Sequence, residues 1–87
     1  MNRLEMIYTI ALDYADEFFN DECYKVIESK SSKDFNSLVN KVQTKMVEDG
    51  KLTADDICNN DMFLVRHNII KGVNDALYMR QVCENIK

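Results

Sequence analysis

The sequence predicts an all-α protein, an antiparallel bundle of three or four helices that dimerises through its long helices. The chain of 87 residues has no proline and only two glycines, Gly50 and Gly72, so it lacks the residues on which the tight turns of a β protein depend. Apolar residues also recur at spacings of three and four along most of the chain, as they do on one face of a helix. At this length we expect one domain, residues 1–87, with a single core.

Residues 2–29 are expected to form one long helix. Its apolar face consists of Leu4, Ile7, Tyr8, Ala11, Tyr14, Ala15, Phe18, Val26 and Ile27. A second apolar set widens that face and consists of Met6, Ile10, Leu12, Phe19, Cys23 and Tyr24. Such a face is too wide for one neighbouring helix to cover, so we expect another copy or another protein to cover part of it.

The segment "SKSSKD" interrupts this pattern and predicts the start of a second helix. Ser31 or Ser32 is the expected N-cap, and Asp34 falls in the first turn, where the helix dipole favours an anion. The helix then continues to Glu48. Its inward stripe consists of Phe35, Leu38, Val39, Val42 and Met46.

The stretch "EDGKLTADDI", residues 48–57, has the look of half an EF-hand calcium loop. With Gly50 at the sixth loop position, however, Lys45 would occupy the first position, where the cation needs a carboxylate. We instead expect Gly50 to end the second helix in a left-handed conformation, Leu52 to fold back onto that helix, and Thr53 to cap the next one. We expect no metal and no cofactor.

The last third of the chain has the most regular pattern, a seam with alternating steps of four and three that is typical of coiled coils. We expect it to be the oligomer or helix-packing seam, formed by Met62, Val65, Ile69, Gly72, Ala76 and Met79, with Cys58 before them and Cys83 and Ile86 after them. Gly72 and Ala76 lie one turn apart, and their small size would let another helix approach closely. Whether residues 53–59 form a separate short helix stays open, because the seam runs through them.

The expected helix lengths favour a dimer. At about 1.5 Å per residue, the first and last helices would each be roughly 40 Å long, against about 25 Å for the middle helix. One end of the long pair would then be uncovered, so we expect a homodimer. The alternative is a monomer in which the middle helix slides along the groove between the other two.

The net charge of −4 is distributed in blocks. Residues 1–28 hold seven acids against two bases, residues 29–46 hold four lysines against one acid, and residues 47–61 hold five acids against one lysine. A protein that binds phosphate backbones needs clustered Lys and Arg. Residues 62–87 are the second basic block, with a net charge of +2. Since an acidic block separates the two basic ones, we expect no nucleic-acid partner.

We do not expect an enzyme. His67 is the only histidine, and Cys23, Cys58 and Cys83 fall on or near apolar faces, where a thiol has low reactivity. Three cysteines without a CxxC pair or a secretory leader predict reduced thiols and a cytoplasmic location. No apolar stretch approaches the roughly 18 residues that a membrane span requires, so we expect no membrane partner.

Five acidic residues near the start of the chain form the candidate partner-binding site. Asp13, Glu17 and Asp21 recur at every fourth position, and Asp16 and Glu22 accompany them. Acids at this spacing repel one another, and a partner protein with a basic surface would relieve that repulsion. We therefore expect a small acidic adaptor or inhibitor, of the kind that phages and other mobile elements make to block a host protein.

The alternative is a homo-oligomer that binds or sequesters an anionic small ligand such as a nucleotide. Arg66, His67, Lys71 and Arg80 would then line a basic pocket between subunits.

Overall fold

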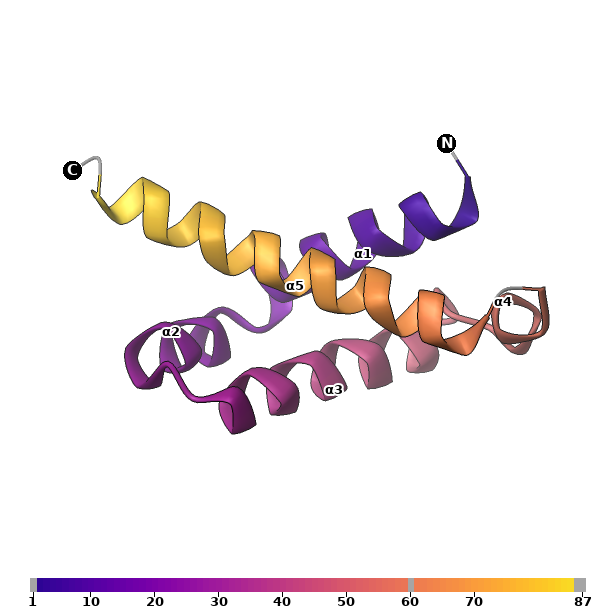
Figure 1. The fold of residues 1–87 in the computed structure, drawn as a ribbon, viewed down its shortest axis with the longest axis horizontal. Helices are drawn as coiled ribbons and strands as arrows, with labels where there is room; N and C mark the ends of the chain where they lie inside the picture. The colour runs from indigo at the N-terminus through magenta and orange to yellow at the C-terminus, as the bar shows by residue number, and fades with distance from the viewer. Residues whose placement is uncertain (1, 60, 86–87) are drawn as a thin grey trace.

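The computed structural model of the chain describes residues 2–59 and 61–85 and confirms an all-helical fold (Figure 1). The described residues form five helices, where the sequence predicted three or four. They are α1 (Arg3–Phe18), α2 (Asn20–Ser29), α3 (Ser32–Glu48), α4 (Ala54–Asn59) and α5 (Met62–Asn85). The additional helices arise because the expected first helix is broken at Phe19 and because residues 54–59 form a short helix of their own.

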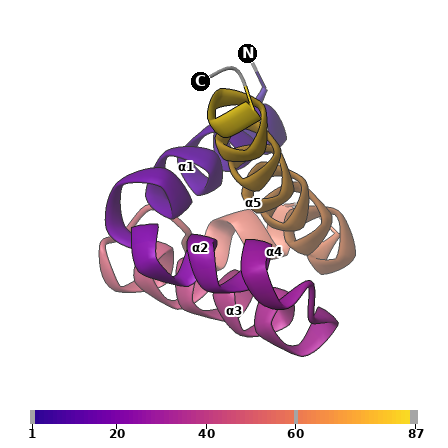
Figure 2. The same ribbon diagram turned by 90° about the vertical axis from the view of Figure 1, so that its left-hand side faces the viewer.

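The helices form two layers. α1 and α5 run in the same direction and cross each other, whereas α3 runs back in the opposite direction (Figure 1). Viewed along the bundle, the pair of α1 and α5 lies over the pair of α2 and α3 (Figure 2). The core fills the space between these layers and consists of Ile7, Ala11, Ala15, Cys23, Val26, Leu38, Val39, Val42, Met46, Leu52, Val65, Ile69, Val73, Ala76 and Leu77.

The crossing of α1 and α5 is very close at Gly72. A Cβ atom at this position would lie 2.6 Å from the carbonyl oxygen of Tyr8, 3.0 Å from the backbone nitrogen of Leu12 and 3.1 Å from Cβ of Ala11. Ala11 and Ala76 beside the crossing are buried as well. The small residues on α5 thus bring two backbones of the same chain into contact, which is the effect expected of small side chains at a helix crossing.

The prediction of one helix over residues 2–29 is wrong, because α1 ends at Phe18 and Phe19 has φ −128° and ψ 42°. Tertiary contacts hold the break. The Arg80 guanidinium donates to the Asp16 carbonyl oxygen over 2.9 Å and also to the Asn20 side chain. The buried Cys23 thiol donates to the Ala15 carbonyl oxygen over 3.4 Å. These donors satisfy carbonyl groups at the end of α1, which lack partners within the helix.

The helix ends around α3 agree with the sequence analysis. Ser31 caps α3 by accepting from the backbone N–H of Asp34 over 3.4 Å. Gly50 has φ +74°, the left-handed conformation that follows a helix end. Leu52 is buried and its N–H donates to the Met46 carbonyl oxygen over 3.2 Å, so the turn folds back as expected.

The chain is folded about as compactly as a typical monomer of its mass. The accessible surface is 5647 Å², only slightly above the roughly 5,300 Å² typical of a monomer of 10.2 kDa. Because α1 is much shorter than expected and α2 packs beside α3, the long uncovered pair of helices does not form. Exposed large apolar side chains remain as local patches instead. None of the helices in the described ranges has the length and apolar character needed to span a bilayer.

Replacement of Gly72 by alanine is expected to lower the free energy of unfolding by about 1–3 kcal/mol, because the added methyl group would overlap backbone atoms of α1 that no side-chain rotation can move. Urea denaturation would measure the loss. Asn74→Ala is the matched control, since Asn74 is exposed on the same helix and its replacement by alanine changes only the helix propensity. A Gly72→Ala variant as stable as the unchanged protein would contradict the close crossing.

Candidate interaction surfaces

The structure divides the expected acidic ridge between two helices. Asp13 and Glu17 lie on the exposed face of α1, whereas Asp21 belongs to α2, beyond the break at Phe19. The every-fourth spacing holds only within one continuous helix, so Asp21 does not extend the row formed by the other two. Within the described part of the chain, these three carboxylates make no hydrogen bond and no ion pair.

The two accompanying acids have partners within the chain. Asp16 accepts from the Arg80 guanidinium over 2.9 Å, and the Glu22 carboxylate lies 3.9 Å from the Lys41 ammonium group. The guanidinium of Arg80 is largely covered, whereas the other three side chains are at least one-third exposed. Asp16 therefore helps to hold the helix break, and it is less available to a partner than Asp13 or Glu17.

The four basic residues of the alternative site point to different neighbours. The Arg66 guanidinium donates to the side-chain oxygen of Gln43 over 2.6 Å. Arg80 is engaged at the helix break, and the Lys71 ammonium group lies 5.7 Å from the centre of the Tyr8 ring. His67 is exposed on the outer side of α5. These residues do not form a basic pocket within the described chain.

The apolar seam is partly inside the chain's own core. Its middle residues, Val65, Ile69, Gly72 and Ala76, are buried. Its outer residues Met62 and Met79 are 42% and 53% exposed, and Cys58 and Cys83 are also exposed. Ile86 lies outside the described residues. The seam thus serves packing against α1 in its centre, while its two ends remain open to solvent.

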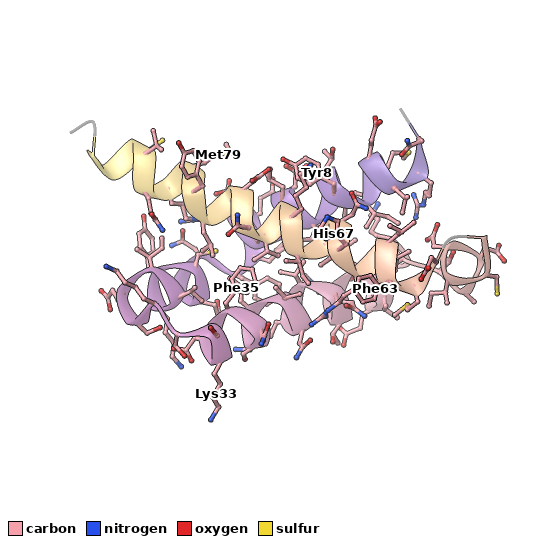
Figure 3. The ribbon with its side chains drawn as sticks, viewed as in Figure 1. Tyr8, Lys33, Phe35, Phe63, His67 and Met79 are labelled. Atoms are coloured by element: carbon pink, nitrogen blue, oxygen red, sulfur yellow. The ribbon has the colours of Figure 1, made fainter. Side chains whose placement is uncertain are left out.

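Sequence analysis missed an apolar patch where α4 meets α5. Ile57, Met62, Phe63 and Leu64 are all exposed there, and Phe63 is 80% exposed. Figure 3 places Phe63 at the start of α5. The signal was present as four consecutive apolar residues, "MFLV", because successive side chains of a helix point about 100° apart and cannot all face one core.

The exposed side chains of Ile57, Met62, Phe63 and Leu64 are called the corner patch below. Val47, on α3, is a further exposed apolar side chain outside this patch, at 52%.

A partly buried ion pair fixes the helix that carries part of the corner patch. The Arg3 guanidinium donates to both carboxylate oxygens of Asp56, over 2.6 and 2.9 Å, and to the Lys51 carbonyl oxygen over 2.6 Å. Asp56 also accepts from the backbone N–H of Thr53 over 2.9 Å. The short α4 is thereby tied to the start of α1. The Arg3 guanidinium and the Thr53 N–H hold the pKa of the Asp56 carboxyl well below its usual range.

A groove of about 700 Å³ lies between the α2–α3 turn and the second half of α5. Its lining consists of Val26, Ile27, Lys30, Ser31, Ser32, Phe35, Asn36, Asn74, Leu77 and Gln81. It contains none of the acidic or basic residues that sequence analysis selected. In the described ranges, no group of three or more His, Cys, Asp or Glu side chains lies close enough together to hold a metal ion.

Comparison with protein-family models, with curated proteins and with solved structures gives no match to this chain. We therefore infer function from the surfaces of the molecule itself.

Asp56→Asn is expected to lower the free energy of unfolding by about 2 kcal/mol at pH 7, because it leaves the Arg3 guanidinium without its charged partner. A carboxyl whose pKa is depressed by folding stabilises the fold above its unfolded pKa of about 3.9, and this contribution is lost as the pH falls further. The difference between the two proteins should therefore shrink below about pH 4.

Urea denaturation across the acid range would measure both effects. Asp55→Asn is the matched control, because Asp55 is the exposed neighbour in the same turn, and its replacement should change stability by less than about 0.5 kcal/mol. A gap between Asp56→Asn and the unchanged protein that stays constant down to pH 2 would contradict the role of this carboxylate.

Proposed function

We propose that the chain is a non-enzymatic protein-binding module, an adaptor or an inhibitor, that acts in the cytoplasm and docks on its partner through the corner patch. The observation that carries this proposal is Phe63, an aromatic side chain that is 80% exposed and is accompanied by three other exposed apolar side chains at the junction of α4 and α5. Aromatic residues at the centre of an apolar patch are typical of the few residues that dominate the energy of a protein interface.

The surroundings of Phe63 favour a rigid docking surface. The Arg3–Asp56 pair anchors α4 on one side of it, and the Arg66–Gln43 contact joins α5 to α3 on the other. An anchored aromatic side chain loses little freedom when it is bound. Covering it completely would contribute about 2 kcal/mol from the removal of apolar surface from water.

Three acidic residues without partners in the described chain add an electrostatic attraction to the proposed docking. Asp13, Glu17 and Asp21 are exposed, and the whole chain has a net charge of −4. We propose that they attract a partner with a basic surface, as in an inhibitor that a phage directs against a host protein. Their effect would be mainly on the rate of association and on its salt dependence, because exposed charges are screened.

The proposal includes a homodimer, because large apolar side chains are exposed at both ends of α5. Those beyond the corner patch are Tyr78, Met79 and Val82. Each copy of such a dimer would have a corner patch of its own, so partner binding through Phe63 would not depend on the dimer.

Phe63→Ser should abolish capture of the partner from a lysate of the native host cells without changing the fold, because Phe63 contributes little to the core. Tyr78→Ser is the matched control, an exposed aromatic residue at the opposite end of the same helix. Quantitative mass spectrometry of the captured proteins is the measurement, and circular dichroism verifies the fold. Equal capture by Phe63→Ser, or equal loss by both variants, would refute the corner patch as the docking site.

A double replacement, Asp13→Lys with Glu17→Lys, should slow association with the captured partner by about tenfold at low salt and less at high salt. Surface plasmon resonance over a series of salt concentrations would measure this. The control is Glu28→Lys with Glu48→Lys, which changes the net charge equally at exposed positions outside the ridge. Equal effects of the two pairs would assign the attraction to net charge alone.

A further inference from the structure

The groove between the α2–α3 turn and α5 has an apolar floor and an uncharged polar rim. Val26 and Leu77 are buried at its base, and Phe35 extends into it from α3 (Figure 3). The rim consists of Ser31, Ser32, Asn36, Asn74 and Gln81. At about 700 Å³ the groove is within the size range of sites that bind small molecules or single side chains.

The groove has very few charged side chains, although the chain as a whole is rich in them. Asp and Glu make up 15 of the 87 residues, yet none of them lines the groove, and Lys30 is the one charged side chain in its lining. An apolar floor with hydroxyl and amide groups around it suits an uncharged group that is apolar in its body and polar at its tip. A phenol has this chemistry, because its ring is apolar and its hydroxyl group needs a hydrogen-bond partner once it is buried.

Such a group lies on the rim of the same groove. Tyr78 is 65% exposed and is the next helical neighbour of two lining residues, Asn74 four positions before it and Gln81 three positions after it. Its ring therefore stands beside the groove. Its own position on α5 directs it outward to solvent, as its exposure shows.

Few free charges lie around Tyr78 among the described residues. Asp75, one turn before it, accepts a hydrogen bond from the Tyr8 hydroxyl, and Lys30 in the groove lining is exposed. Met79, Val82 and Cys83 are exposed and uncharged, and the guanidinium of Arg80 is held by Asp16 and Asn20. In a dimer with two-fold symmetry a patch meets its own copy near the axis, so any charge there would face a like charge. An acidic chain can associate with itself most readily through a surface of this kind.

We propose that this face is a self-association surface, in which Tyr78 of each copy inserts into the groove of the other. A protruding ring next to a groove that fits it is self-complementary under a two-fold axis, and one contact of this kind implies a second, identical one. The occupant of the groove is thus a second copy of the chain. The inference deepens the proposed homodimer by assigning its interface, and it is independent of the corner patch.

The test uses the full chain in sedimentation equilibrium over a concentration series. The unchanged protein should dimerise, and Tyr78→Ser should raise the dissociation constant of the dimer by at least about tenfold. Asn36→Trp, at an exposed position of the rim, should fill the groove and have the same effect. Circular dichroism would verify that both variants keep the helical fold.

A mixture of the two variants provides the sharpest result. Tyr78→Ser retains a groove and Asn36→Trp retains a tyrosine, so one of the two insertions is intact in the mixed dimer and none is intact in either variant alone. The mixture should therefore associate more tightly than each variant by itself. Phe63→Ser is the matched control and should dimerise like the unchanged protein, because Phe63 lies at the other end of α5.

Four results would overturn the inference. They are a monomer at every concentration, a Tyr78→Ser variant that dimerises like the unchanged protein, a mixture no tighter than its components, and loss of the dimer in Phe63→Ser. All of these are measured on the purified chain, so failure here leaves the capture experiment on Phe63 unaffected, and failure there leaves this one unaffected.

Discussion

The contact between the backbones of α1 and α5 at Gly72 determines the rest of the structure. A glycine in the middle of a 24-residue helix costs about 1 kcal/mol against alanine, and here it lets the Tyr8 carbonyl approach where a side chain would stand. α1 crosses α5 near its middle, and the exposed apolar side chains of α5 lie toward its two ends. Both proposed surfaces, the corner patch and the face around Tyr78, lie at these ends.

The crossing also explains why α1 stops where it does. A continuous helix over residues 2–29 would continue away from α5 and α3, and it would leave Cys23 and Val26 outside the core. The break at Phe19 returns the chain to α3, and Arg80 from α5 satisfies the freed Asp16 carbonyl. Burial raises the pKa of the Cys23 thiol, which keeps it protonated and able to donate to the Ala15 carbonyl. Residues distant in sequence thus supply what a proline or glycine supplies in other helix breaks.

This dependence on distant residues separates what the sequence could predict from what it could not. The stripe of α3, its Ser31 cap and the left-handed Gly50 follow from neighbours within a few positions, and the structure has them all. The break at Phe19 has no local signal, because its cause lies on α5, some 60 residues later. Because one continuous helix was expected there, Asp21 was also expected on the same helix face as Asp13 and Glu17, whereas it belongs to α2. Phe63 differs from these cases, because it lies in the run "MFLV", of which the regular seam accounts only for Met62 and Val65.

The two ends of α5 differ in the partners that they suit. Around the corner patch, exposed carboxylates such as Asp55 and Asp61 flank the apolar side chains, so a second acidic copy would be repelled there and a basic partner would be favoured. Around Tyr78 the described side chains are mostly uncharged, Arg80 is paired with Asp16, and Lys30 is the charge in the groove lining, so a copy of the same chain would meet less repulsion there. Charge thus distinguishes two apolar surfaces that hydrophobicity alone would not, which is why we propose another protein as the partner of the first and a second copy of the chain as the partner of the second.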